Sequence, residues 1–143
     1  MPIVINSWIT PEYYQLMPDI HNDSVKALFI SCDKKSFPTI ISDPPEKIHK
    51  SLFIKEKPYC LFFARGFHMY VSPLETYVSK YPNHIATTMV RQYGLHSEKE
   101  IVYGNVVLFG SFNLMTMEMD NKDHSVPYDI IEESWRIYDA KKY

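Results

Sequence analysis

Short β-favouring runs separated by polar, turn-forming segments dominate the first two-thirds of the chain. Val25–Cys32 (VKALFISC) and Phe37–Ser42 (FPTIIS) are joined by the polar residues 33–36, a connection of hairpin length. The pattern predicts an antiparallel pair of strands. Because Pro38 cannot donate a hydrogen bond to a neighbouring strand, we expect the second strand to lie at a sheet edge or to begin one residue later.

The most apolar part of the chain follows the same pattern. Tyr59–Ala64 (YCLFFA) and Phe67–Val71 (FHMYV) flank the pair Arg65-Gly66, which predicts a tight hairpin. At the N-terminus, Pro2–Trp8 predicts another strand, followed by a short helix that ends before Pro18.

The run Ile101–Gly110 (IVYGNVVLFG) differs from these because it is apolar on both faces of an extended chain. Such a run is typical of a strand at the centre of a sheet. Within it, Gly104-Asn105 indicates a bulge or a close backbone approach rather than a two-residue turn, since the flanking runs are unequal in length.

Three segments have the spacing of amphipathic helices. Asn83 precedes apolar residues at one-and-four spacing and Gly94 follows them, so we expect Asn83 to cap this helix. Its replacement by Ala should cost about 1 kcal/mol, and replacement by Ser much less. A short helix is predicted after Asp43. A longer helix is predicted after Pro127, with apolar residues on one side and charged residues on the opposite side. The apolar stripe of the last helix comprises Tyr128, Ile131, Trp135 and Tyr138, flanked by Ile130 and Ile137.

Strands and helices are mixed without a regular βαβ alternation. This order favours an α+β fold in which a mainly antiparallel sheet packs against two or three helices. The 143 residues lack a linker or a repeat, so we expect a single domain over residues 1–143. The C-terminal helix either closes the core of its own domain or is shared with a second copy in a homodimer. We favour the first, because a domain of this size needs most of its amphipathic faces to close its own core.

Composition and charge narrow the range of partners. Fifteen Lys and Arg against seventeen Asp and Glu give a net charge of −2, which argues against a nucleic-acid-binding protein.

The first residues lack the pattern of a signal peptide, and no run is long enough for a membrane span. Only Cys32 and Cys60 are present, so we expect an intracellular protein with reduced thiols.

Sequence motifs for catalysis or cofactor binding are not found. The six histidines lack zinc-site spacing, and Asp19-x-His21-x-Asp23 is better explained as a solvated loop than as a metal site. Four glycines form neither a GxGxxG nor a phosphate-binding loop. Cys60 has apolar neighbours that would raise its pKa, so it is expected to be structural. We therefore expect no catalytic residue, no metal and no cofactor.

One resemblance is carried by short motifs in the second half of the chain. Asn83, Ala86 and Thr87 at a helix start, Val102, Gly104 and Asn105 in a strand, and Val126-Pro127 at a helix entry occur in this order. The order resembles a family of small uncharacterised domains carried by bacteriophages and large DNA viruses, over about residues 70–139. The resemblance implies a viral origin, and it implies no activity or catalytic residue.

Three functions remain open, one of them a minor component of the virion. The first is a small viral or phage-type accessory protein that binds a host or viral protein without catalysis, in the host-cell cytoplasm or in the virion. The second is a protein that sequesters or hydrolyses a small molecule or nucleotide. The binding residues that we expect for it are Arg65, His68, Arg91 and His96.

Overall fold

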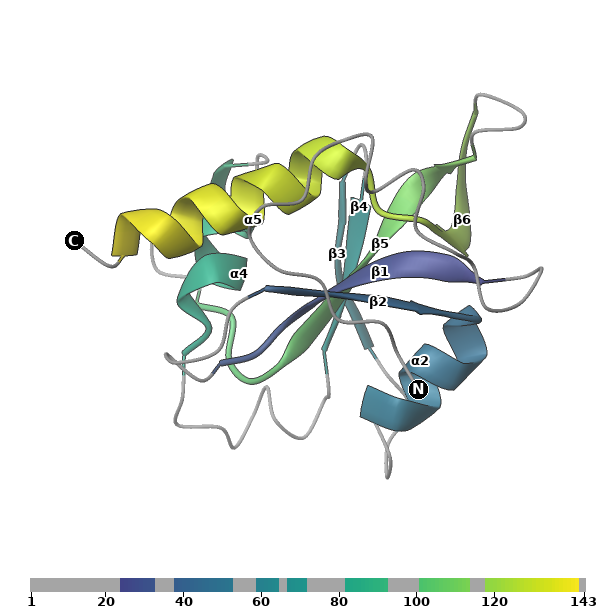
Figure 1. Ribbon diagram of the computed structural model, residues 1–143, viewed down its shortest axis with the longest axis horizontal. Helices are drawn as coiled ribbons and strands as arrows, with labels where there is room; N and C mark the ends of the chain where they lie inside the picture. The colour runs from purple at the N-terminus through teal and green to yellow at the C-terminus, as the bar shows by residue number, and fades with distance from the viewer. Residues whose placement is uncertain are drawn as a thin grey trace.

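Strands of one antiparallel sheet form the centre of the computed structural model, and helices lie on both faces of the sheet (Figure 1). The structure describes residues 24–32, 38–52, 59–64, 67–71, 82–92, 101–113 and 118–141. In this part of the chain, α4 (His84–Gln92) and α5 (Tyr128–Lys141) cover one face, and α2 (Pro45–Leu52) lies against the other. The α+β prediction, with an antiparallel sheet and two or three helices, is confirmed.

The order of the strands confirms the two predicted pairs. The order is β2-β1-β5-β4-β3, with β6 paired to β5, and the pairs β1–β2 and β3–β4 are antiparallel. β2 begins directly after Pro38 and lies at one end of this order, as the missing amide of proline requires. The strands are β1 (Val25–Ile30), β2 (Thr39–Asp43), β3 (Tyr59–Ala64), β4 (Phe67–Val71), β5 (Val106–Asn113) and β6 (Glu118–His124).

The central strand is predicted correctly, but its bounds differ from those expected. β5 lies between β1 and β4, yet it begins at Val106 instead of Ile101 and runs on to Asn113. The backbone of Gly104 has φ 79°, a left-handed conformation that suits glycine and that interrupts an extended chain. The predicted strand and helix within residues 2–18 lie outside the described residues.

Two of the three motifs that carry the viral resemblance, the helix start at Asn83 and the strand segment at Gly104-Asn105, meet in one hydrogen-bonded junction. Asn83 caps α4, as predicted, by accepting from the Ala86 amide at 3.1 Å. Its own side-chain amide donates to the carbonyls of Ile30 at 3.0 Å and Gly104 at 2.9 Å. Asn105 accepts from the backbone amide of Cys32 at 3.0 Å. These residues therefore serve the architecture by fixing α4 to β1 and to the entrance of β5.

α5 closes the core of its own chain with the face predicted to be apolar. Ile130, Ser134 and Ile137 of this helix are buried, whereas Trp135, a member of the predicted stripe, is half-buried. The fully buried Ser134 is small enough for close packing and donates its hydroxyl to the Ile131 carbonyl at 2.7 Å. Pairing of α5 in a homodimer stays a prediction.

The two faces of the sheet bury different kinds of side chain. The face under α4 and α5, here the α4/α5 face, is apolar throughout its main cluster. The face under α2, here the α2 face, has a smaller apolar cluster formed by Ala27, Ile41, Ile48, Val107 and Phe109. Since alternate residues of a strand point to opposite faces, Met69 of β4 belongs to the first face, and His68 and Tyr70 belong to the second.

Candidate functional site

A cluster of polar side chains on the α2 face gathers around one carboxylate. Asp123 of β6 accepts hydrogen bonds from His68 Nε2 at 2.6 Å and from the Tyr70 hydroxyl at 2.9 Å. Its second oxygen accepts from His49 Nε2, on α2, at 3.0 Å. On the far side of the His68 ring, Nδ1 lies 3.0 Å from the Ser111 hydroxyl. We call these five residues the Asp123 cluster.

Strand geometry explains how these residues meet. His68 and Tyr70 are two residues apart in β4 and share a face, and the register of the sheet pairs His68 with Phe109 of β5. Ser111 is two residues beyond Phe109 and follows it on the same face. α2 contributes His49 because the neighbouring Ile48 is buried and anchors this turn of the helix against the sheet.

A close backbone approach places Asp123 beside the cluster. β6 pairs with β5 through Gly110 and His124, after which the register shifts. A Cβ atom at Gly110 would lie 2.0 Å from the carbonyl oxygen of Ser125, so only glycine fits there. The contact brings the end of β6 against β5, and Asp123 with it.

Hydrogen bonds determine the charge state of the cluster. Burial alone would raise the pKa of Asp123, but the hydrogen bonds from His49, His68 and Tyr70 and the positive charge of His49 outweigh it and hold this pKa well below its usual range. Asp123 is therefore ionised. Since a carboxylate only accepts hydrogen bonds, both Nε2 atoms carry a proton. In the neutral ring, His68 Nδ1 then accepts from the Ser111 hydroxyl.

Ser111, His68 and Asp123 are hydrogen-bonded in series. They are the residue types of a catalytic triad, but they have no access to a substrate. Ser111 is 0% exposed and His68 is 1% exposed. A nucleophile has to reach the reacting atom of its substrate, and this serine has no surface from which to do so. The outer members, Asp123 and His49, have side chains that are 15% and 16% exposed. In this conformation the cluster joins β4, β5, β6 and α2.

The predicted binding residues do not share one pocket. His68 lies in the Asp123 cluster, whereas Arg91 is exposed on α4, which packs on the opposite face of the sheet. Arg65 and His96 lie outside the described residues. A ligand-binding role of these residues stays a prediction, and the sheet lies between His68 and Arg91.

Sequence reasoning missed His49 and Asp123. Asp123 belongs to β6, whose sequence EMDNKDH contains one apolar residue, Met119, and therefore shows no alternation that would predict a strand. His49 was part of a correctly predicted helix, but nothing in the spacing connects it with a carboxylate 74 positions later. The alternation of His68 and Tyr70 in one strand was the only available signal.

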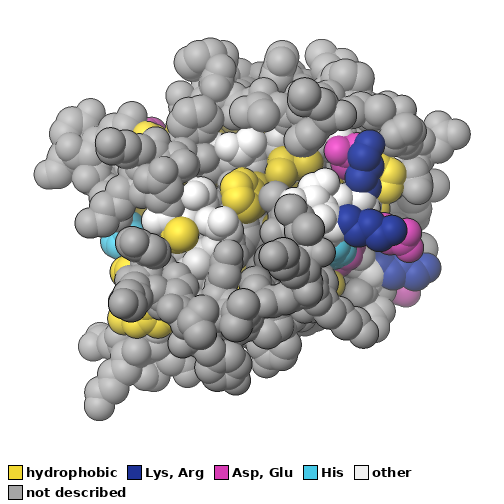
Figure 2. Space-filling view, turned by 90° about the horizontal axis from the view of Figure 1, so that it is seen from below, with side chains coloured by type: hydrophobic (Ala, Val, Ile, Leu, Met, Phe, Trp, Pro, Cys, Tyr) yellow, Lys and Arg dark blue, Asp and Glu magenta, His cyan; other side chains and the backbone are white. Residues whose placement is uncertain are grey.

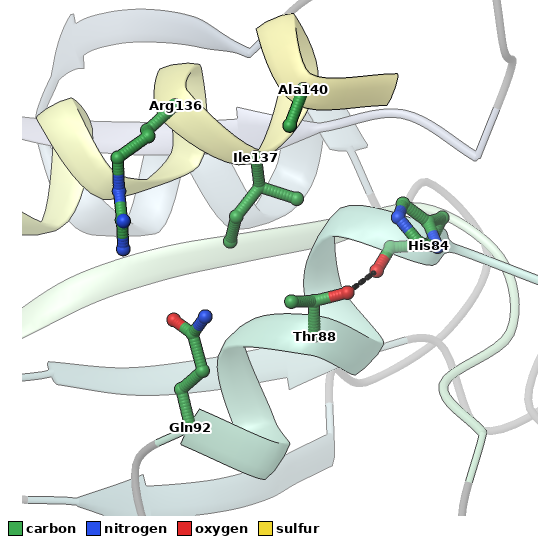
Figure 3. A pocket seen from close by; sticks show the side chains of 6 residues that line it. All are labelled: His84, Thr88, Gln92, Arg136, Ile137 and Ala140. Carbon is green, nitrogen blue, oxygen red and sulfur yellow. Dashed lines mark hydrogen bonds between the residues drawn. The ribbon is translucent and has the colours of Figure 1, made fainter. Parts of the chain in front are cut away.

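A groove on the other side of the molecule offers space for a ligand. It lies between α4 and α5 and has a volume of about 340 Å³. In Figure 3, Arg136 of α5 and Gln92 of α4 reach toward each other across it, and Thr88 donates to the His84 carbonyl at 2.8 Å. The α4/α5 groove is lined by His84, Thr88, Gln92, Arg136, Ile137 and Ala140.

The described part of the chain holds no group of three or more His, Cys, Asp or Glu that is arranged to bind a metal ion. None of its helices is both long enough and apolar enough to cross a membrane. Cys32 is half-buried and forms no disulfide, and the side chain of Cys60 lies outside the described residues.

Comparison of the chain with known protein families, with characterised proteins and with solved structures finds no match. The resemblance to domains of bacteriophages and large DNA viruses therefore stays a prediction. It rests on the junction around Asn83, whose residues have structural roles.

Proposed function

We propose that this chain is a small accessory protein of the viral or phage type that acts by binding a protein partner, without catalysis. The observation that supports the proposal is the closure of the Asp123 cluster. Its carboxylate accepts three hydrogen bonds, and both ring nitrogens of His68 have partners inside the protein. Ser111 and His68 are 0% and 1% exposed and cannot reach a substrate in this conformation, which favours a binding role over catalysis.

Location and origin belong to the same proposal. The resemblance around Asn83 implies a viral chain, and the low cysteine content favours a reducing compartment such as the host-cell cytoplasm, with a place in the virion as the alternative. In either location the partner is a host or viral protein.

Reciprocal capture tests the proposal. The tagged chain would be expressed in infected cells, cross-linked and purified, and any protein recovered in stoichiometric amount would be made separately and titrated against the pure chain. We expect a saturable one-to-one complex. In parallel, the chain would be incubated with a panel of nucleotides and metabolites that is followed by mass spectrometry. Turnover of any compound that is lost in Asp123→Asn would contradict a non-catalytic protein.

A second candidate, the binding of a small molecule, is favoured by the α4/α5 groove. Its volume of about 340 Å³ lies within the range of about 300–1,000 Å³ that is typical of small-molecule sites. Arg136 and Gln92 could bind an anionic or polar ligand above the apolar Ile137. Native mass spectrometry with the same panel tests this candidate, and Ala140→Trp, which fills the groove, should abolish binding.

A further inference from the structure

The imidazole of His49 is inserted between three side chains that all belong to the sheet. Its Nε2 lies 3.0 Å from the Asp123 carboxylate, and its ring centroid lies 4.7 Å from that of Tyr70 and 5.1 Å from that of Phe109. The ring meets Tyr70 edge to face, at an interplanar angle of 77°. His49 therefore contacts one anion and two aromatic rings, as a bound ligand would.

The three contacted side chains are held in place without His49. Asp123 is fixed by His68 and by the Tyr70 hydroxyl, and the rings of Tyr70 and Phe109 pack edge to face with centroids 5.7 Å apart. They project from β6, β4 and β5, which are hydrogen-bonded neighbours in one sheet. Removal of His49 would leave a preformed hollow that ends in a carboxylate.

Among the described side chains, Ile48 and His49 anchor α2 to the sheet, and Lys47 forms an ion pair with Asp43 of β2 at 3.7 Å. Glu46, Lys50 and Ser51 are exposed. A helix of eight residues is marginal in isolation, so its folded state depends on these contacts. On the face that Figure 2 shows, most of the visible Lys, Arg, Asp and Glu side chains lie at the right, with a histidine beside them. α2 is thus the described helix that can separate from the sheet at the lowest cost.

An ionised carboxylate beside aromatic rings matches one class of ligand. Planar nitrogen cations donate N–H groups to carboxylates and pack well against aromatic rings. We propose that His49 is an internal occupant of a binding site for a planar nitrogen cation, imidazolium or guanidinium, formed by Asp123, Tyr70 and Phe109, and that this site opens when α2 lifts from the sheet. The ligand is either a free small molecule or the side chain of an arginine in a peptide.

Chemical rescue in His49→Ala tests the proposal. Removal of the ring should empty the site, and imidazole at pH 6, where its ring is mostly protonated, should then bind and raise Tm. An imidazole ring has about five non-hydrogen atoms, which limits its affinity, and we expect half-saturation at about 1–10 mM. At ten times that concentration Tm should rise by about 5 °C. Where His49→Ala is unfolded, imidazole should restore its circular dichroism.

Matched controls assign the effect to this site. Lys50→Ala, an exposed position of the same helix, and His49→Gln, which keeps a donor in the site, should show no rise in Tm with imidazole. The double variant His49→Ala/Asp123→Asn should lose the rise. Pyrazole, which has nearly the same shape and is uncharged at pH 6, should bind at least tenfold more weakly than imidazole.

Methylguanidinium and acetyl-arginine amide distinguish the two ligand sources. Equal binding of both to His49→Ala supports an arginine side chain, and binding of methylguanidinium alone supports a free small molecule. A rise in Tm that is equal in Lys50→Ala, that persists without Asp123, or that is absent in His49→Ala would overturn the proposal. The test uses the isolated chain, so its result is separate from that of partner capture.

Discussion

The two faces of the sheet carry out opposite tasks with residues that alternate along the same strands. On the α4/α5 face, β4 contributes Phe67, Met69 and Val71 to a cluster that is closed by apolar residues of α4 and α5. On the α2 face, the same strand contributes His68 and Tyr70, which donate hydrogen bonds to a carboxylate beside the short helix α2. One face gains stability by removing apolar surface from water, and the other retains groups that are costly to bury.

This difference indicates where the molecule can tolerate change. An apolar core accepts substitutions of similar volume, because its stability depends on area and packing. A buried ionic cluster contributes little net stability, but removal of one member is costly since the others lose their partner. A charged cluster that is retained under a weakly anchored helix therefore suggests a role beyond stability, which is the reasoning behind the proposed cation site.

The largest effect should come from the apolar face. Met69→Ala removes a fully buried side chain and should lower the free energy of unfolding by about 2–5 kcal/mol, because it combines lost burial with a cavity. The loss should be the same at pH 5 and pH 8, since no charged group is involved. Urea unfolding at both pH values measures it. A strongly pH-dependent loss would mean that the apolar face is coupled to the charged groups of the other face, and that the two faces are not independent.

Asn83 should show the next largest effect, and its variants separate its role as a helix cap from its role as a donor to two backbone carbonyls. Asn83→Ala should cost about 2–3 kcal/mol, because the cap is lost and the carbonyls of Ile30 and Gly104 lose a buried donor. Asn83→Ser keeps an acceptor for the Ala86 amide but loses both donors, so it should recover less than half of this loss. Thermal unfolding of both variants measures the difference.

The Asn83 result would revise the expectation that was drawn from the sequence alone. If Asn83 served only as a helix cap, its replacement by serine would cost almost no stability. Stability of Asn83→Ser equal to that of the unchanged chain would support this simpler role. Asn83→Asp is the informative control, since it keeps the cap acceptor and replaces the amide donor by a second acceptor. We expect it to be at least as destabilising as Asn83→Ala.

Local patterns in the sequence were sufficient for much of the fold. Pro38 indicated the edge strand, Asn83 the start of α4, and Pro127 the start of α5, because each acts on its own neighbours along the chain. β6 was not predicted, although only residues 114–117 separate it from β5, because its sequence EMDNKDH shows no apolar alternation. The start of β5 was misplaced because the left-handed Gly104 is fixed by a residue from another element, Asn83.

The candidate site was less predictable than the fold for the same reason. His68 was named, but its partners Asp123 and Ser111 are 55 and 43 positions away, and no spacing rule joins them. Arg91 was grouped with His68 on residue type alone, and the sheet separates the two. Residue types suggest chemistry, whereas the face on which each residue lies decides which groups can act together.

On the α2 face, Asp123→Asn should cost about 1–3 kcal/mol at pH 7, because hydrogen bonds to a charged acceptor are replaced by weaker ones. The folded-state pKa of Asp123 is lowered, so its contribution to stability is complete above the unfolded value of about 3.9 and is lost as the pH falls below it. The ¹³C shift of the Asp123 carboxyl group should therefore remain that of the ionised form at pH 3. A titration midpoint near 3.9 would contradict the role of the three donors.

The smallest effect should be at Arg136, which lies on the outside of the α4/α5 face. Its side chain is 70% exposed and bonds to Glu133 one turn earlier, with Nε 3.0 Å from the carboxylate. Exposed pairs of this kind contribute about 0–1 kcal/mol, so Arg136→Ala and Glu133→Gln should each leave Tm nearly unchanged, and a double-mutant cycle should give a coupling that fades with added salt. If Arg136→Ala instead abolishes the binding of a ligand or partner at unchanged Tm, the α4/α5 face carries function in its outer groove. Each face of the sheet would then combine an apolar structural core with a polar site at its rim. The functional difference would lie between interior and surface, and no longer between the two faces.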